Sequence, residues 1–133
     1  GSPILGGPYY GRTDEVFENW RSRIRRVAER SNVFVKLGAL PIRMPGFDGD
    51  RSLPPGSEEV AAAWRPWIET CIEAFGAERA MFESNFPVQK RWCSYQVCWN
   101  AFKLLAAGAS GDEKCGLFAG AAARAYRMKD PSA

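Results

Sequence analysis

The polar residues with the clearest chemical potential lie at the end of a short apolar run, residues 80–87 (AMFESNFP). A helix is expected to end before this run, at Gly76, and another to begin after it, near Ser94. That arrangement is typical of a buried parallel strand whose last residues face a site. Because side chains alternate along a strand, Glu83 and Asn85 should point to the same side.

A lysine joins these two residues from a neighbouring strand. Lys36 lies near the carboxyl end of a short run that is rich in β-branched and apolar residues, residues 33–37 (VFVKL). We therefore predict that Lys36, Glu83 and Asn85 form a catalytic cluster where the two strands end. The alternative is that Lys36 and Glu83 form an ion pair inside the sheet that only neutralises two charges.

Further candidates lie on the loops that follow the two predicted strands. Arg43 falls in a long glycine- and proline-rich loop over residues 38–55, and loops of that length are often functional. Gln89, Lys90 and Arg91 follow the second strand. We interpret these four residues as substrate-binding, because cationic side chains suit a substrate carboxylate. The alternative is ordinary solvated loop charge.

The sequence lacks the residues that most often carry acid–base and metal chemistry. None of its 133 residues is a histidine, which is the commonest general base and the commonest metal ligand. The four cysteines, Cys71, Cys93, Cys98 and Cys115, include no C-x-x-C pair, so no residue of this chain is predicted to bind metal. Three of them fall in helical patterns and are expected to be buried free thiols, which suit a reducing cytosol.

The mild net charge of +3 does not indicate a nucleic-acid partner. Such binding would need a broader basic patch and a reading motif, and the sequence contains neither. It also contains no signal peptide and no apolar segment of membrane length, so we expect a cytoplasmic protein without a membrane partner. The densest positive charge falls on one helix and is interpreted as a solvated face: Arg21, Arg23, Arg25, Arg26 and Arg30.

The elements that must position the candidate residues alternate between helices and strands, which indicates an α/β fold with a parallel sheet. Residues 1–12 are predicted to form a loop, residues 13–128 the folded part and residues 129–133 a tail. Pro66 is expected to divide one helical region, because proline lacks the N–H that a helix interior needs. The predicted order is helix 13–30 capped by Thr13, strand 33–37, helices 57–64 and 66–75 with Ser57 as cap, strand 81–85, helix 94–108, and a last helix opened by a capping box at Ser110.

Only two strands are evident, and a stable parallel sheet usually has more strands covered on both faces. The alternation of helices and strands therefore fits a parallel sheet, but the two strands make up only part of one.

Four segments together resemble the carboxyl-terminal part of amidohydrolase-related proteins, the TIM-barrel metal-dependent hydrolases grouped with dicarboxylate lactone hydrolases and related decarboxylases. These segments are residues 33–38 (VFVKLG), 71–76 (CIEAFG), 81–87 (MFESNFP) and 123–126 (ARAY). The resemblance implies a partial (β/α)8 barrel, in which the two strands are the seventh and eighth. A whole barrel usually needs about 250 residues, so this chain would be a single carboxyl-terminal fragment, and the metal-site histidines would lie upstream of it.

The resemblance also implies an activity. It implies hydrolysis of a lactone, ester or amide, or a related decarboxylation, of a small carboxylated substrate, by water that a divalent metal such as zinc or manganese activates. Two positions depart from the family's pattern: Asn85 stands where an aspartate is usual, and Gln89 where relatives often carry one. Whether this chain is an enzyme is therefore left open, and alone we expect it to bind no metal and to be inactive.

A second interpretation assigns no catalytic activity to the chain. A truncated, non-enzymatic module could form a homo-oligomer by pairing its exposed strand edges with those of another copy. In the first reading, the partner of those edges is the missing amino-terminal portion of the barrel.

Overall fold

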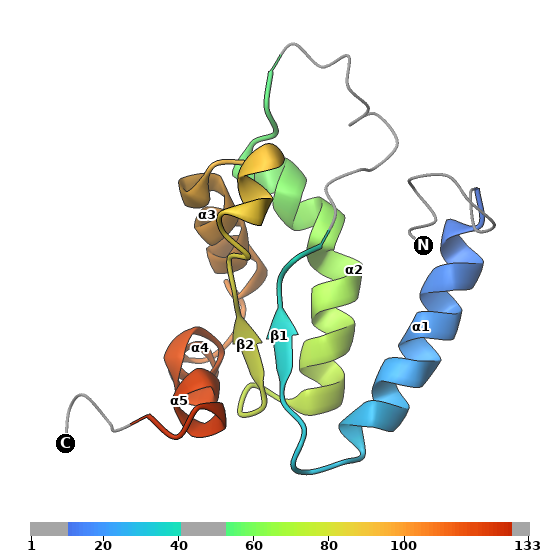
Figure 1. Ribbon diagram of the computed structural model, residues 1–133, viewed down its shortest axis with the longest axis vertical. Helices are drawn as coiled ribbons and strands as arrows, with labels where there is room; N and C mark the ends of the chain where they lie inside the picture. The colour runs from blue at the N-terminus through green and yellow to red at the C-terminus, as the bar shows by residue number, and fades with distance from the viewer. Residues whose placement is uncertain (1–10, 41–52, 129–133) are drawn as a thin grey trace.

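The structure, a computed structural model, describes residues 11–40 and 53–128. Figure 1 shows the two strands side by side at the centre, with α1 and α2 on one side of them and α3, α4 and α5 on the other. The elements in chain order are α1 (Thr13–Ala28), β1 (Val35–Leu37), α2 (Ser57–Phe75), β2 (Ala80–Phe82), the 3₁₀ helix η1 (Val88–Arg91), α3 (Tyr95–Leu105), α4 (Gly111–Cys115), the π-helical segment η2 (Gly116–Gly120) and α5 (Ala121–Ala125).

The two strands are parallel, as the alternation of helices and strands predicted. In their register Lys36 lies opposite Met81, and Leu37 lies opposite Phe82. Leu37 and Phe82 belong to the core cluster, and the Phe82 ring stacks on the Phe102 ring with centroids 4.6 Å apart. Lys36 and Met81 therefore occupy the opposite face of the pair.

Both strands are shorter than the predicted ranges 33–37 and 81–85. The second strand ends early because local side-chain bonds take over its backbone. The Glu83 carboxylate accepts a hydrogen bond from the Asn85 N–H at 3.2 Å, and the Ser84 hydroxyl accepts one from the Phe86 N–H at 3.4 Å. Asn85 has a φ of 52°, in the left-handed region that asparagine tolerates. Such local bonds compete with strand pairing.

The predicted division of the helical region at Pro66 is wrong, because α2 runs through it without a break. Because Pro66 has no N–H, the Ala62 carbonyl lacks its usual helical hydrogen-bond donor. Both residues are exposed, so water can solvate that carbonyl. Trp64 and Ile68 on the opposite face are buried in the core and hold the helix in place. The Thr70 hydroxyl also donates to the Pro66 carbonyl at 2.8 Å.

The predicted helix ends are partly confirmed. Ser94 caps α3, with its hydroxyl accepting from the Val97 N–H, and Ser110 with Glu113 forms the predicted capping box of α4. The predictions of Thr13 and Ser57 as caps are wrong. The N-cap residues are Arg12, which makes no side-chain cap bond, and Gly56, whose N–H donates to the Glu59 carboxylate at 2.9 Å.

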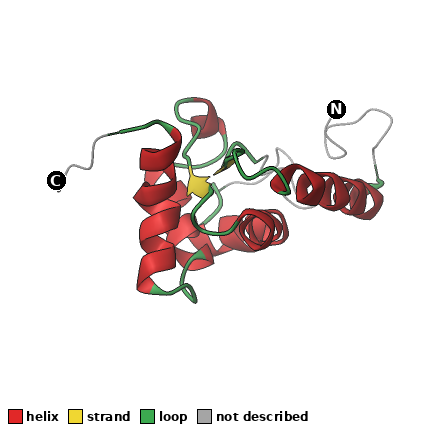
Figure 2. Cartoon of the chain, turned by 90° about the horizontal axis from the view of Figure 1, so that it is seen from below, coloured by secondary structure: helices red, strands yellow, loops and turns green. Residues whose placement is uncertain are grey.

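The core lies between the strands, α2 and α3, and α1 is peripheral to it. Seen from below in Figure 2, α1, the helix nearest the N-terminus, stands to one side of the other helices. Ala28 is its only buried residue, and its Trp20 ring packs on the Trp67 ring of α2 with centroids 4.7 Å apart. The largest fully buried side chains are Trp64, Phe102, Ile68, Leu117, Val60 and Cys98.

The cysteines are free, and three are buried, but not the three that helical patterns predicted. Cys71 and Cys98 are buried as expected, Cys115 is exposed, and Cys93, outside a helix, is buried. In the described part of the chain, no helix combines the length and the hydropathy that crossing a membrane requires.

Candidate functional site

The carboxyl ends of β1 and β2 bring Lys36 and Glu83 together. The Lys36 Nζ atom lies 3.9 Å from the Glu83 Oε2 atom, at the outer limit for an ion pair. The side chain of Lys36 is 55% exposed and that of Glu83 is 24% exposed. A pair with an exposed lysine and atoms this far apart contributes little to stability, so the lysine is held loosely and stays accessible to solvent.

Asn85 follows Glu83 within one tight turn. Its backbone N–H donates to the Glu83 carboxylate, and its carbonyl accepts from the Gln89 N–H at 3.0 Å. The structure therefore brings Lys36, Glu83 and Asn85 into one region, although Asn85 lies beyond the strand rather than on its alternating face. An amide side chain cannot accept a proton from water as a carboxylate does.

Gly38, which is not among the predicted site residues, permits the close approach of the two strand ends. A Cβ atom at this position would lie 2.1 Å from the Glu83 carbonyl oxygen and 2.9 Å from the Glu83 Cγ atom. Only glycine fits there without displacing the backbone. The glycine at the end of an apolar run was the signal that could have identified this contact.

The predicted substrate-binding residues have different environments. Gln89 is 2% exposed, and its Nε2 atom donates to the Leu40 carbonyl at 3.2 Å, which ties η1 to the segment after β1. Lys90 and Arg91, at the end of η1, are exposed beyond β2. Arg43, like most of the predicted loop over residues 38–55, lies outside the described residues.

The residues present do not fit a metal ion. Within residues 11–40 and 53–128, no group of three or more histidine, cysteine or acidic side chains is placed to hold one, and the whole chain lacks histidine. Glu83 is the acidic residue of the cluster, and its carboxylate already engages Lys36 and the Asn85 backbone. A metal at this position would need its ligands from elsewhere.

A groove of about 180 Å³ runs along the outer edge of β1, between α1 and α2. Apolar side chains dominate its lining, and Lys36 lies at one border. No strand within the described residues pairs with this edge. The lining residues are Trp20, Ile24, Val35, Lys36, Leu37, Gly38, Leu40, Trp67, Ile68 and Cys71.

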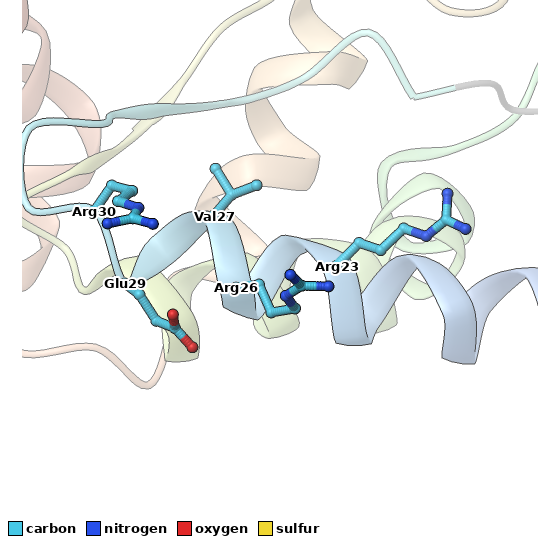
Figure 3. A pocket seen from close by; sticks show the side chains of 5 residues that line it. All are labelled: Arg23, Arg26, Val27, Glu29 and Arg30. Atoms are coloured by element: carbon cyan, nitrogen blue, oxygen red, sulfur yellow. The ribbon is translucent and has the colours of Figure 1, made fainter.

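A second depression, of about 390 Å³, lies on the arginine-rich end of α1 and does not resemble a site. All five lining residues come from the last turns of α1 and the two residues after it, and Figure 3 shows their side chains spread along this stretch rather than converging on one point. They are Arg23, Arg26, Val27, Glu29 and Arg30. This agrees with the interpretation of these arginines as a solvated face.

The comparisons with known proteins agree with one another. A family model described as amidohydrolase matches residues 5–128. An uncharacterised protein of Sinorhizobium fredii is 40% identical over 112 residues, which cover 84% of this chain and 34% of that protein. The L-fucono-1,5-lactonase of Burkholderia multivorans is 28% identical, over 99% of this chain and 42% of the lactonase.

Solved structures give the same result. A crystal structure of a Burkholderia multivorans amidohydrolase with bound zinc superposes with a TM-score of 0.73 at 26% identity, over 87% of this chain and 39% of that one. A second crystal structure of it, with bound HEPES, gives a TM-score of 0.75 over 90% and 40%. The chain thus spans less than half the length of each of these relatives.

Proposed function

This chain belongs to the amidohydrolase family, and from that premise we propose that it supplies the last two strands of a (β/α)8 barrel that hydrolyses a small carboxylated substrate. In this proposal β1 is the seventh strand and β2 the eighth. The bond cleaved is that of a lactone, ester or amide, with decarboxylation as a related outcome. Among these bonds, the similarity to a lactonase supports a lactone most strongly.

The observation that carries the proposal is the position of the polar cluster. In barrels of this type the substrate site lies at the carboxyl ends of the strands, and Lys36, Glu83 and Asn85 gather there. Glu83 would hold the Lys36 ammonium and the Asn85 turn in place. Lys36, which is exposed and loosely paired, would contact the substrate, and the Asn85 amide would orient it by hydrogen bonding.

Two exposed cations extend this cluster. Lys90 and Arg91 lie on η1, directly after β2, and we propose that they attract and hold the substrate carboxylate. Arg43 is proposed for the same role. The buried Gln89 would act indirectly, because its amide fixes the position of the Leu40 carbonyl and hence of the loop that follows β1.

The upstream strands would complete both the barrel and its chemistry. The apolar groove beside β1 supports this, because it lies along an edge where another strand could pair. A divalent metal, zinc or manganese, is proposed for the completed barrel only, with ligands from outside this chain. The zinc in the related crystal structure supports that part of the proposal.

The test compares this chain with a longer polypeptide. The chain alone, assayed against sugar lactones with added Zn²⁺ or Mn²⁺, should show no turnover above buffer. The polypeptide extended upstream to include a His-x-His strand should bind one of these metals and hydrolyse a lactone. In that longer protein Lys36→Met should lower kcat/KM at least about tenfold, which is roughly 1.4 kcal/mol of transition-state stabilisation.

Arg65→Met is the matched control, because Arg65 is an exposed cation that pairs with Glu69 on α2, away from the strand ends. It should leave kcat/KM unchanged. Turnover by the isolated chain would contradict the predicted inactivity. An extended polypeptide that binds metal but hydrolyses no lactone, ester or amide would contradict the proposed reaction.

The open edge of β1 also supports the second candidate, a module that self-associates. Two copies would pair strand edges in a symmetric dimer. Light scattering with size-exclusion chromatography at several concentrations distinguishes the candidates. A stable dimer of the isolated chain would favour self-association, and a folded monomer would count against it.

A further inference from the structure

Two buried cysteines flank the start of α3. Cys93 immediately precedes the N-cap residue Ser94, and Cys98 lies one turn inside the helix. Cys93 is 4% exposed and Cys98 is 0% exposed. The two thiols lie close enough for each to shift the pKa of the other through a hydrogen bond, although four residues lie between them in sequence.

The spacing of the two residues is that of a hydrophobic staple. In this motif the residue before the N-cap packs on the fourth residue of the helix and fixes the angle at which the chain enters it. Cys93 and Cys98 occupy those two positions around Ser94. Packing explains why both are buried, but any two apolar side chains could provide it. Two neighbouring thiols can also be joined by oxidation.

The two thiols differ in acidity, and the difference assigns them separate roles. The hydrogen bond with Cys98 lowers the pKa of the Cys93 thiol. The same bond, burial and the nearby charge of Glu83 raise the pKa of the Cys98 thiol. Because the thiolate is the nucleophile in cysteine oxidation, Cys93 is the thiol that reacts first with an oxidant.

We propose that Cys93 and Cys98 form a redox-modification site, at which a peroxide converts the staple into an intramolecular disulfide. The Cys93 thiolate attacks one peroxide oxygen, the O–O bond breaks, and Cys93 becomes a sulfenic acid while the other oxygen leaves as water. The Cys98 sulfur then attacks the sulfenic sulfur and releases a second water. Hydrogen peroxide is thereby reduced by two electrons, and the two thiols are oxidised by two electrons.

The disulfide would tighten the segment that reaches the candidate site. The Cys93 N–H and the Trp92 N–H both donate to the Gln89 carbonyl, and the Gln89 side chain holds the Leu40 carbonyl after β1. A covalent link from Cys93 to α3 therefore restrains η1 and, through Gln89, the loop end beside Gly38. Oxidation would hold the carboxyl ends of both strands in one arrangement.

The test uses the folded chain with Cys115→Ser, which removes the exposed thiol. After treatment with hydrogen peroxide, the protein is unfolded, alkylated and digested with trypsin. Cleavage after Arg91 and Lys103 places both cysteines in one peptide, residues 92–103. This peptide should lose two mass units and resist alkylation, and dithiothreitol should reverse both changes. Cys71, a buried thiol whose pKa burial raises to about 11, should stay reduced.

Two controls make the result specific. With Cys98→Ala, which keeps a small apolar group in the staple, Cys93 should gain oxygen without any loss of two mass units. In urea the selective pairing should give way to mixed disulfides that include Cys71. The proposal is overturned if residues 92–103 of the folded protein keep two alkylatable thiols while wild-type Cys115 is oxidised, or if Cys93 gains oxygen while Cys98 stays free.

Discussion

The two ends of the strand pair each carry a cation, and the two cations are held very differently. At the amino end, the guanidinium group of Arg79 donates to three backbone carbonyls, those of Ala28 at 3.0 Å, Arg30 at 2.9 Å and Val33 at 3.3 Å. At the carboxyl end, the Lys36 ammonium has one ion-pair contact, at 3.9 Å from Glu83. Arg79 also lies over the Phe75 ring, whereas Lys36 is largely in solvent.

This difference indicates that the cation at the amino end has a structural role, whereas the cation at the carboxyl end does not. Arg79 satisfies carbonyls at the end of α1, where unpaired acceptors and the helix dipole both favour a cation. Its side chain therefore fastens the amino end in addition to the backbone bond from the Val35 N–H to the Arg79 carbonyl at 2.8 Å. The carboxyl end has no such side-chain clamp within the described residues and is held mainly by its backbone, through the contact between Gly38 and Glu83 and the hydrogen bond from the Glu83 N–H to the Leu37 carbonyl. Its polar side chains remain available, as a substrate site requires.

The largest expected effect comes from Gly38→Ala. The added Cβ would lie 2.1 Å from the Glu83 carbonyl oxygen, so the strand ends must separate and the hydrogen bond to Leu37 must lengthen. We expect a loss of about 3 kcal/mol in the free energy of unfolding, the upper end for overpacking a tight contact. Urea denaturation followed by circular dichroism measures it.

Gly111→Ala is the matched control, because a Cβ there meets nothing within 4 Å and lies in the first turn of α4. It should be neutral or slightly stabilising, since alanine favours helix. Equal effects of the two substitutions would contradict backbone fastening of the carboxyl end.

The second-largest expected effect is on the amino end of the strand pair. Arg79→Ala removes three hydrogen bonds that a charged donor makes, and water can replace part of them at the exposed end of α1. We expect a loss of about 2 kcal/mol in unfolding free energy, together with faster amide hydrogen exchange in the last turn of α1. Arg79→Lys keeps the charge but not the planar fork of donors, so it should recover less than half of the loss. Full recovery by lysine would show that charge alone fastens this end.

The sequence predicted the order of elements, the parallel pairing and the meeting of Lys36 with Glu83, because these depend on local periodicity and on the direction of parallel strands. It failed at Pro66, where burial of Trp64 and Ile68 outweighs the missing backbone bond. It failed at the end of β2, where side-chain bonds to the Asn85 and Phe86 backbone end the strand early.

The role of Arg79 could not have been predicted from sequence either. Its three acceptors lie 46 to 51 residues away along the chain, and no local pattern reports contacts of that range. The contact between Gly38 and Glu83 is equally remote, but there the glycine at the end of an apolar run was a signal in the sequence. The spacing of Cys93 and Cys98 around Ser94, in contrast, was present in the sequence as a staple pattern, and it could have been read once Ser94 was assigned as a cap.

The smallest expected effect decides between the two interpretations of the Lys36–Glu83 pair. If the pair serves the site, Lys36→Met should change the free energy of unfolding by less than about 0.5 kcal/mol, as for other exposed ion pairs. The exposed Arg65–Glu69 pair on α2, with its atoms 2.8 Å apart, is the reference, and Arg65→Met should have an effect of the same size. If the pair instead neutralises buried charge, Lys36→Met should cost about 3 kcal/mol or more, because it would leave the Glu83 carboxylate unpaired. If Lys36→Met lowered the free energy of unfolding as much as Arg79→Ala, the cations at both ends of the strand pair would have structural roles. That result would contradict the assignment of Lys36 to the proposed site.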